Sequence, residues 1–193
     1  MKFMTDFGDE AVILPLFLVV GVTFYAMGGR RGGIVWAVGI ATILTCLVAA
    51  KLFGLYWGEV FGFVGRPFSV SGHVAASAAV YGSLLNIILH SRRRSWFLAL
   101  LPPLVVAGVI GYTRLQLHAH TQAEIVCGAV LGTVGALALY RILSPVPGHI
   151  VQCALLVSIC VIVVFHGYMF HAEPLLQNMF HTSYRSASHV LAW

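Results

Sequence analysis

Long apolar segments separated by short polar ones make up most of this sequence. Each segment is close to the roughly 20 residues that a helix needs to cross a bilayer. The segments are continuous apolar runs, whereas barrel strands alternate over about 10 residues, so the pattern predicts helices. We therefore expect an all-α, polytopic membrane helical bundle with about six transmembrane helices, over residues 11–27, 34–56, 70–90, 96–114, 121–142 and 149–170.

The composition agrees with this pattern. The chain is 60% hydrophobic and 9% charged, whereas soluble domains carry roughly 25% charged residues. Because the spans use most of the chain, we expect a single domain over residues 1–193. Acidic residues precede the first span, which argues against a secretory signal peptide. The cysteines lie in apolar spans and their spacing fits no metal site. We therefore expect them to be buried and to act as small apolar side chains: Cys46, Cys127, Cys153 and Cys160.

The formal charge of +5 is compatible with nucleic acid or with anionic lipid. The arginines lie mostly in short loops, which favours the membrane and argues against nucleic acid. With six spans, Arg30, Arg31, Arg92, Arg93, Arg94 and Arg141 fall on one side, and Lys2, Lys51, Arg66, Arg114 and Arg185 on the other. Lys and Arg in short loops mark the cytoplasmic side. Because Lys51, Arg66 and Arg114 fit a polar site, we place that site and both termini outside, at the periplasmic face of a bacterial inner membrane.

Scarce polar residues gather near the ends of several spans. Helical rise places Lys51 and Arg114 at the same outer level, and cations at such depth are costly and usually functional. An arginine fork matches phosphate oxygens, and free N–H groups at helix N-termini bind phosphate. The sequence therefore predicts a phosphate site built from Lys51, Arg66, Ser71, Gly72, His73, Arg114, His120 and Glu124.

Two histidines divide the expected chemistry. Glu124 lies one helical turn after His120 and can orient that ring, as the acid does in a catalytic triad. This makes His120 the nucleophile and His73 the acid that protonates the leaving oxygen. No metal or cofactor is required, because the cations neutralise the developing charge. Capping alternatives stay open: Ser71 fits an N-cap, and Glu124 fits a capping box with Thr121.

Other histidines offer weaker alternatives. His118 is the rival nucleophile, but the residue four positions later is Gln122, which is no carboxylate. A metal site would need other histidines near the last span and tail, and their spacing fits no standard motif: His166, His171, His181 and His189.

The polar motifs resemble those of the type 2 phosphatidic acid phosphatase family, membrane enzymes that share a core fold with vanadium haloperoxidases. The family pattern is a lysine, then Arg-Pro, then Pro-Ser-Gly-His, then Ser-Arg-x5-His-x3-Asp. Departures are Val70 for proline, Glu124 for aspartate, and Glu59 where the lysine usually lies. The resemblance covers about 51–131 as catalytic core, through Arg66-Pro67, Ser71-Gly72-His73, Thr113-Arg114 and His120.

The resemblance implies a haloperoxidase-like helical core and a role for each matching residue. Lys51, Arg66, Ser71, Gly72 and Arg114 would bind phosphate, His73 would be the acid and His120 the nucleophile.

We expect a metal-independent phosphatase that acts on a lipid phosphate or pyrophosphate through a phosphohistidine. Undecaprenyl pyrophosphate, phosphatidic acid, phosphatidylglycerol phosphate and lipid A phosphate all fit. A lipid phosphotransferase, a haloperoxidase and a non-enzymatic lipid-phosphate carrier remain alternatives, and the oligomeric state is open. Residues 171–193 are too short and polar to span, and we expect an interfacial helix after Pro174.

Overall fold

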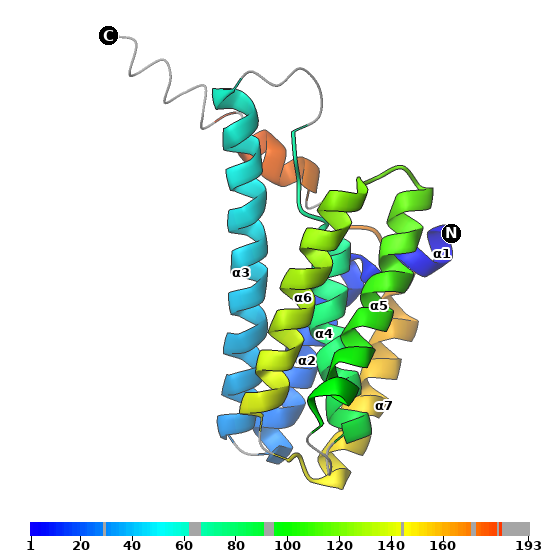
Figure 1. The fold of residues 1–193 in the computed structure, drawn as a ribbon. Coiled ribbons are helices and arrows are strands. Elements are labelled where there is room, and N and C mark those ends of the chain that lie inside the picture. The colour runs from blue at the N-terminus through cyan, green and yellow to red at the C-terminus, as the bar shows by residue number, and fades with distance from the viewer. Residues whose placement is uncertain are drawn as a thin grey trace.

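The computed structural model describes residues 1–28, 30–61, 67–90, 95–143, 145–170, 173–180 and 182. Helices dominate this part of the chain, and no strand occurs in it (Figure 1). Residues 173–180 form a short helix after the last long one. The elements before it are α1 (Lys2–Thr5), η1 (Asp6–Gly8), α2 (Glu10–Gly28), α3 (Arg30–Val60), α4 (Gly72–His90), α5 (Trp96–Gln116), α6 (Gln122–Ile142) and α7 (Gly148–Phe165).

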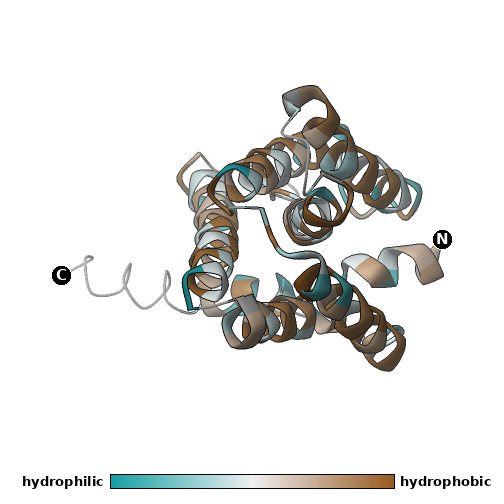
Figure 2. Ribbon diagram, turned by 90° about the horizontal axis from the view of Figure 1, so that it is seen from below, coloured by the Kyte–Doolittle hydropathy of each residue, from teal (hydrophilic) through white to brown (hydrophobic). Residues whose placement is uncertain are grey.

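Six of these helices are long and apolar enough to cross a membrane. They are α2 to α7, and each corresponds to one predicted span, so the fold predicted from the hydropathy pattern is confirmed. Hydrophobic residues make up most of the helical ribbons (Figure 2), and many large apolar side chains are exposed; Phe97 is 85% exposed and Val163 is 74% exposed. Such surfaces suit lipid contact, since the bilayer core is the apolar solvent of these helices.

The cysteines correct one expectation. Cys46, Cys127 and Cys160 are exposed and Cys153 is half-buried, so the prediction that they are buried was wrong. In a bilayer an apolar side chain does not need burial inside the protein, and hydropathy alone does not distinguish the lipid-facing side of a helix from its packed side.

Helix α4 is the central element of the bundle. About 72% of the residues in its most apolar stretch are buried inside the protein, against 22–39% for the other spanning helices. Its contact with α6 depends on glycine: a Cβ on Gly128 would lie 2.7 Å from the carbonyl oxygen of Ser71, and one on Gly132 would collide with the carbonyl oxygen of Ala75. Small residues allow close helix approach in membranes, and here they bring together the N-terminal ends of α4 and α6.

The described charged residues divide between the two ends of the bundle. Arg30 begins α3 and Arg141 lies in the last turn of α6, both at the end opposite the N-terminus (Figure 1). The other end holds the N-termini of α4 and α6, the C-terminus of α5, the C-terminal part of α3 and residues 173–180. The predicted polar site therefore has elements from across the chain around it.

Candidate active site

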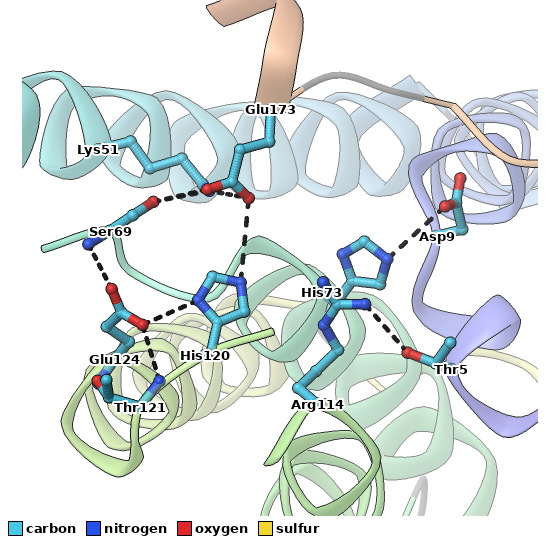
Figure 3. A network of polar contacts seen from close by, with 10 residues as sticks. All are labelled: Thr5, Asp9, Lys51, Ser69, His73, Arg114, His120, Thr121, Glu124 and Glu173. Carbon is cyan, nitrogen blue, oxygen red and sulfur yellow. Dashed lines mark hydrogen bonds and ion pairs between the residues drawn. The ribbon is translucent and has the colours of Figure 1, made fainter. Parts of the chain in front are cut away.

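His120 and Glu124 form the centre of the polar end. His120 lies in the turn between α5 and α6, and Glu124 lies in the first turn of α6. Nδ1 of His120 is 3.2 Å from Oε2 of Glu124 (Figure 3). Both residues are buried, at 5% and 2% exposure. Because a carboxylate only accepts hydrogen bonds, this contact puts the ring proton on Nδ1 and leaves Nε2 with its lone pair.

Glu124 also forms the predicted capping box. Its Oε2 accepts from the backbone N–H of Thr121 at 2.8 Å, and its own N–H donates to Oγ1 of Thr121 at 3.4 Å. The same carboxylate therefore caps α6 and contacts His120. Capping and orientation are not competing explanations here, since a carboxylate has enough lone pairs for both.

A backbone segment that the sequence reasoning did not assign is attached to the same carboxylate. The N–H of Ser69 donates to Oε1 of Glu124 at 2.7 Å, and the N–H of Ser71 donates to the carbonyl oxygen of Glu124 at 3.1 Å. These bonds hold residues 69–71 against the start of α6. Glu124 thus fixes both the histidine and the chain that leads into α4.

Lys51 reaches this end from α3. It is only 7% exposed, and its Nζ lies 3.2 Å from Oγ of Ser69 and 3.1 Å from Oε2 of Glu173. Oγ of Ser69 in turn donates to Oε1 of Glu173 at 3.0 Å. By contrast, Glu59, where the family pattern has its lysine, is exposed on the same helix.

Glu173 brings a carboxylate between these groups. Its Oε2 lies 3.9 Å from Nε2 of His120 (Figure 3). Burial opposes ionisation of Glu173, but the charge and hydrogen bond of Lys51, with help from His120 and Ser69, outweigh it and hold the pKa of Glu173 below its ordinary value. The carboxylate is therefore an anion at neutral pH.

The pKa of His120 lies below its ordinary value. Burial is the main cause, because it disfavours the charged imidazolium. Glu173 and Glu124 act in the opposite direction, and the nearby charge of Arg114 adds to the lowering. A neutral His120 at physiological pH has the lone pair that a nucleophile needs.

The second histidine lies across a cavity of about 380 Å³ from the first. His73, in the first turn of α4, and His120 both line this cavity, together with Arg114 and Glu173. Nε2 of His73 is 3.6 Å from Oδ2 of Asp9. Nη1 of Arg114 donates to Oγ1 of Thr5 at 3.4 Å, so the N-terminal segment forms part of the cavity wall.

The structure brings most of the predicted site residues to this end. Arg66 lies outside the described residues. Ser71 is fully buried and its Oγ has no hydrogen-bond partner, so the predicted side-chain cap is absent. A Cβ on Gly72 would lie 3.4 Å from Cε of Lys51, which is an ordinary van der Waals contact. The others that lie around the cavity or its neighbouring network are Lys51, His73, Arg114, His120 and Glu124.

The rival histidines lie elsewhere. His118 is exposed, with a backbone φ of 50° in the turn after α5. His166 packs against the rings of Phe3 and Phe7 in tilted geometry, and its Nε2 is 3.0 Å from the carbonyl oxygen of Phe3. His171, His181 and His189 lie outside the described residues.

Three residues of the site were missed by sequence reasoning: Asp9, Ser69 and Glu173. The available signal was that all six acidic residues fall on the side of the polar motifs. Asp9, Glu10 and His73 each bring one ligand atom within 4.8 Å of the others, so among the described residues this is the set that could hold a cation.

Comparison with known proteins identifies one family and one similar protein. Residues 50–146 match the family model of the PAP2 superfamily. A Klebsiella pneumoniae protein named "Uncharacterized 22.5 kDa protein in cps region" is 33% identical over 153 residues, which are 74% of this chain and 68% of that protein. No solved structure gives a significant match. The matched range contains all the residues predicted for the site, from Lys51 to Glu124.

Proposed function

We propose that this chain, which belongs to the PAP2 superfamily, removes phosphate from a membrane lipid. The superfamily is of phosphatase type, which suggests activity on phosphate esters. The substrate is a lipid phosphate or pyrophosphate at the outer face of a bacterial inner membrane. The reaction passes through a phosphohistidine at His120, with His73 as the acid.

The Glu173 carboxylate is the observation that carries this proposal. It is an anion held by Nζ of Lys51 at 3.1 Å and by Oγ of Ser69 at 3.0 Å, with Nε2 of His120 3.9 Å away. A carboxylate presents two oxygens in one plane with its carbon, as one edge of a phosphate group presents two oxygens in one plane with the phosphorus. The same groups can therefore bind a substrate phosphate with its phosphorus in front of the histidine, once Glu173 moves aside.

In the first step, Nε2 of His120 attacks phosphorus and the bond from phosphorus to the leaving oxygen breaks. The leaving oxygen takes a proton from His73, so a lipid phosphate departs as a neutral alcohol and a lipid pyrophosphate departs as the lipid monophosphate. Glu124 accepts the hydrogen bond from Nδ1 of His120 and stabilises the positive charge that develops on that ring. Lys51 and Arg114 neutralise the equatorial oxygens.

The second step regenerates the enzyme. His73 is now neutral and accepts a proton from water, whose oxygen attacks phosphorus. The bond between phosphorus and Nε2 of His120 breaks, inorganic phosphate leaves, and His73 holds its proton again. The two histidines thus return to their starting forms without a net change in protons on the protein.

A second cavity supports a lipid as substrate. It has a volume of about 690 Å³ and shares Glu124 with the polar network, and apolar residues of α3 and the following segment form much of its wall, among them Phe53, Trp57 and Phe68. These three side chains are also exposed at the bundle surface. A hydrocarbon chain could lie here, where it gains apolar contact, while the headgroup reaches the polar cavity.

The test is phosphate release by detergent-purified protein from undecaprenyl pyrophosphate, phosphatidic acid, phosphatidylglycerol phosphate and lipid A phosphate. The reactions would be run with EDTA, with vanadate, and with His120→Ala as the matched variant. We expect release that persists in EDTA, falls with vanadate and is absent in the variant. Lipid binding without release from any substrate would contradict the proposal and favour a carrier.

A further inference from the structure

The ring of His73 faces a carboxylate to which no function has been assigned. Asp9 lies between η1 and α2, is 7% exposed, and has Oδ2 3.6 Å from Nε2 of His73 (Figure 3). We propose that Asp9 is a positioning residue for the general acid His73, forming a second carboxylate–histidine pair beside Glu124 and His120. This inference rests on the proposed phosphatase function.

Asp9 is held rigidly for this task. Its Oδ1 accepts from the N–H of Ala11 at 2.9 Å and from the N–H of Phe170 at 2.8 Å. The first bond caps the start of α2, and the second ties in the segment after α7. With Oδ1 engaged by two backbone groups from different parts of the chain, Oδ2 is directed at His73.

The pairing selects which nitrogen of His73 can act. Nε2 faces Asp9, and the other ring nitrogen, Nδ1, lies on the side of the ring toward His120 (Figure 3). A proton on Nδ1 is therefore available to an oxygen that leaves phosphorus in the cavity between the two rings. The carboxylate also attracts the positive charge that His73 carries before it donates.

The two carboxylate–histidine pairs are assembled from different parts of the chain. Glu124 lies one turn from His120 on the same part of the chain, whereas Asp9 belongs to the N-terminal segment and His73 to α4. The N-terminal segment also supplies Thr5, which accepts from Nη1 of Arg114 at 3.4 Å. On this inference, the first residues of the chain complete the acid half of the site.

The experiment compares Asp9→Asn, His73→Asn and the double variant. Asparagine keeps an oxygen for the N–H groups of Ala11 and Phe170 and is itself a good N-cap, so the fold is retained while the charge facing His73 is lost. Asp6→Asn is the matched control, because it removes one negative charge from the same segment without removing a contact to His73. The readout is leaving-group release in a single turnover.

Two probe substrates separate proton donation from other effects. Dioctanoyl phosphatidic acid releases an alcohol that needs a proton, whereas p-nitrophenyl phosphate releases a stable phenolate that does not. We expect Asp9→Asn to slow release from the phosphatidic acid by about tenfold to a hundredfold, within the range for general acids. Release of p-nitrophenolate should fall much less, and Asp6→Asn should leave the ratio of the two rates near the wild-type value.

The double variant tests whether Asp9 acts through His73. If it does, Asp9→Asn adds little to the loss already caused by His73→Asn, because effects of residues that act as a unit are not additive. Equal losses on both substrates, or losses that multiply in the double variant, would overturn the role of Asp9. A wild-type protein that releases neither leaving group would instead overturn the proposed phosphatase function.

Discussion

Oε2 of Glu173 lies 3.1 Å from Nζ of Lys51 and 3.9 Å from Nε2 of His120. One carboxylate oxygen thus joins the proposed phosphate-binding lysine to the proposed nucleophile. Because Glu173 belongs to the short helix at residues 173–180, this helix is part of the site. A substrate phosphate at the same position has to compete with this carboxylate.

Replacing Glu173 with glutamine should therefore strengthen anion binding. The amide keeps the shape of the side chain but removes the negative charge next to the incoming phosphate. We expect the inhibition constant of orthovanadate to fall by roughly tenfold, about 1.4 kcal/mol. Asn178→Ala, on the exposed side of the same helix, is the control and should show no such change. Weaker vanadate binding in Glu173→Gln would mean that the carboxylate helps to bind the anion.

The pH dependence follows from the lowered pKa of His120. The nucleophile must be neutral, so kcat/KM should fall as the pH drops through that pKa, and the acidic limb should lie below the ordinary value of 6.5. Because Glu173 acts to raise this pKa, Glu173→Gln should move the acidic limb to still lower pH. The measurement is kcat/KM on a short-chain lipid phosphate between about pH 4 and 8. An acidic limb above 6.5, or an upward shift in the variant, would contradict a neutral nucleophile held by burial.

The Glu124 network predicts a joint loss of activity and stability. In Glu124→Gln an amide NH₂ can replace Oε2, where it would face the N–H of Thr121 and Nδ1–H of His120. We expect kcat to fall by about 10²–10⁴ and the free energy of unfolding by about 1–3 kcal/mol, measured by steady-state kinetics and thermal melts in detergent.

Thr121→Ala is the matched control for capping alone. It removes the Oγ1 acceptor but keeps the N–H that binds Glu124, so it should cost about 1 kcal/mol of stability and leave most of kcat. If both variants lost activity equally, Glu124 would act mainly as a capping residue.

The sequence was informative where the signal is local. Each span is a continuous apolar run. Arg114, His120 and Glu124 lie within eleven consecutive residues that form the end of α5, the following turn and the start of α6. Lys51 lies at the polar end as predicted from helical rise, on the buried side of α3, which continues to Val60; its role in phosphate binding stays a prediction. The substitution at Val70 is also accommodated, because this side chain packs with Leu47 and Ala75.

The contacts between distant segments could not be predicted from local sequence patterns. Asp9 meets His73, and Glu173 meets Lys51, only after helices far apart in the sequence have packed together. No periodicity records such pairings, and Asp9 and Glu173 look like ordinary surface acids at the ends of helices. The prediction that the cysteines are buried failed for a related reason, since hydropathy does not distinguish a side chain packed inside the protein from an apolar side chain exposed on its surface.

The apolar cavity beside Glu124 predicts a dependence on the lipid chain. Trp57 lines it and is stacked near Phe53 and Phe61. Trp57→Ala should raise KM for a long-chain phosphatidic acid by about tenfold, the effect of losing roughly 1–2 kcal/mol of apolar contact, and leave KM for p-nitrophenyl phosphate unchanged. Equal changes for both substrates would show that the hydrocarbon chain binds elsewhere.

The central claim is that phosphate is transferred to His120, and trapping that intermediate tests it most directly. The His73→Asn variant, which lacks the proposed base for the second step, would be mixed with p-nitrophenyl phosphate, quenched in alkali to preserve phosphohistidine, and digested for mass spectrometry. We predict phosphate on His120 that accumulates in this variant and is missing when His120→Ala is added. Phosphate on His118, or turnover of the wild-type protein with no phosphorylated histidine, would contradict the proposed mechanism.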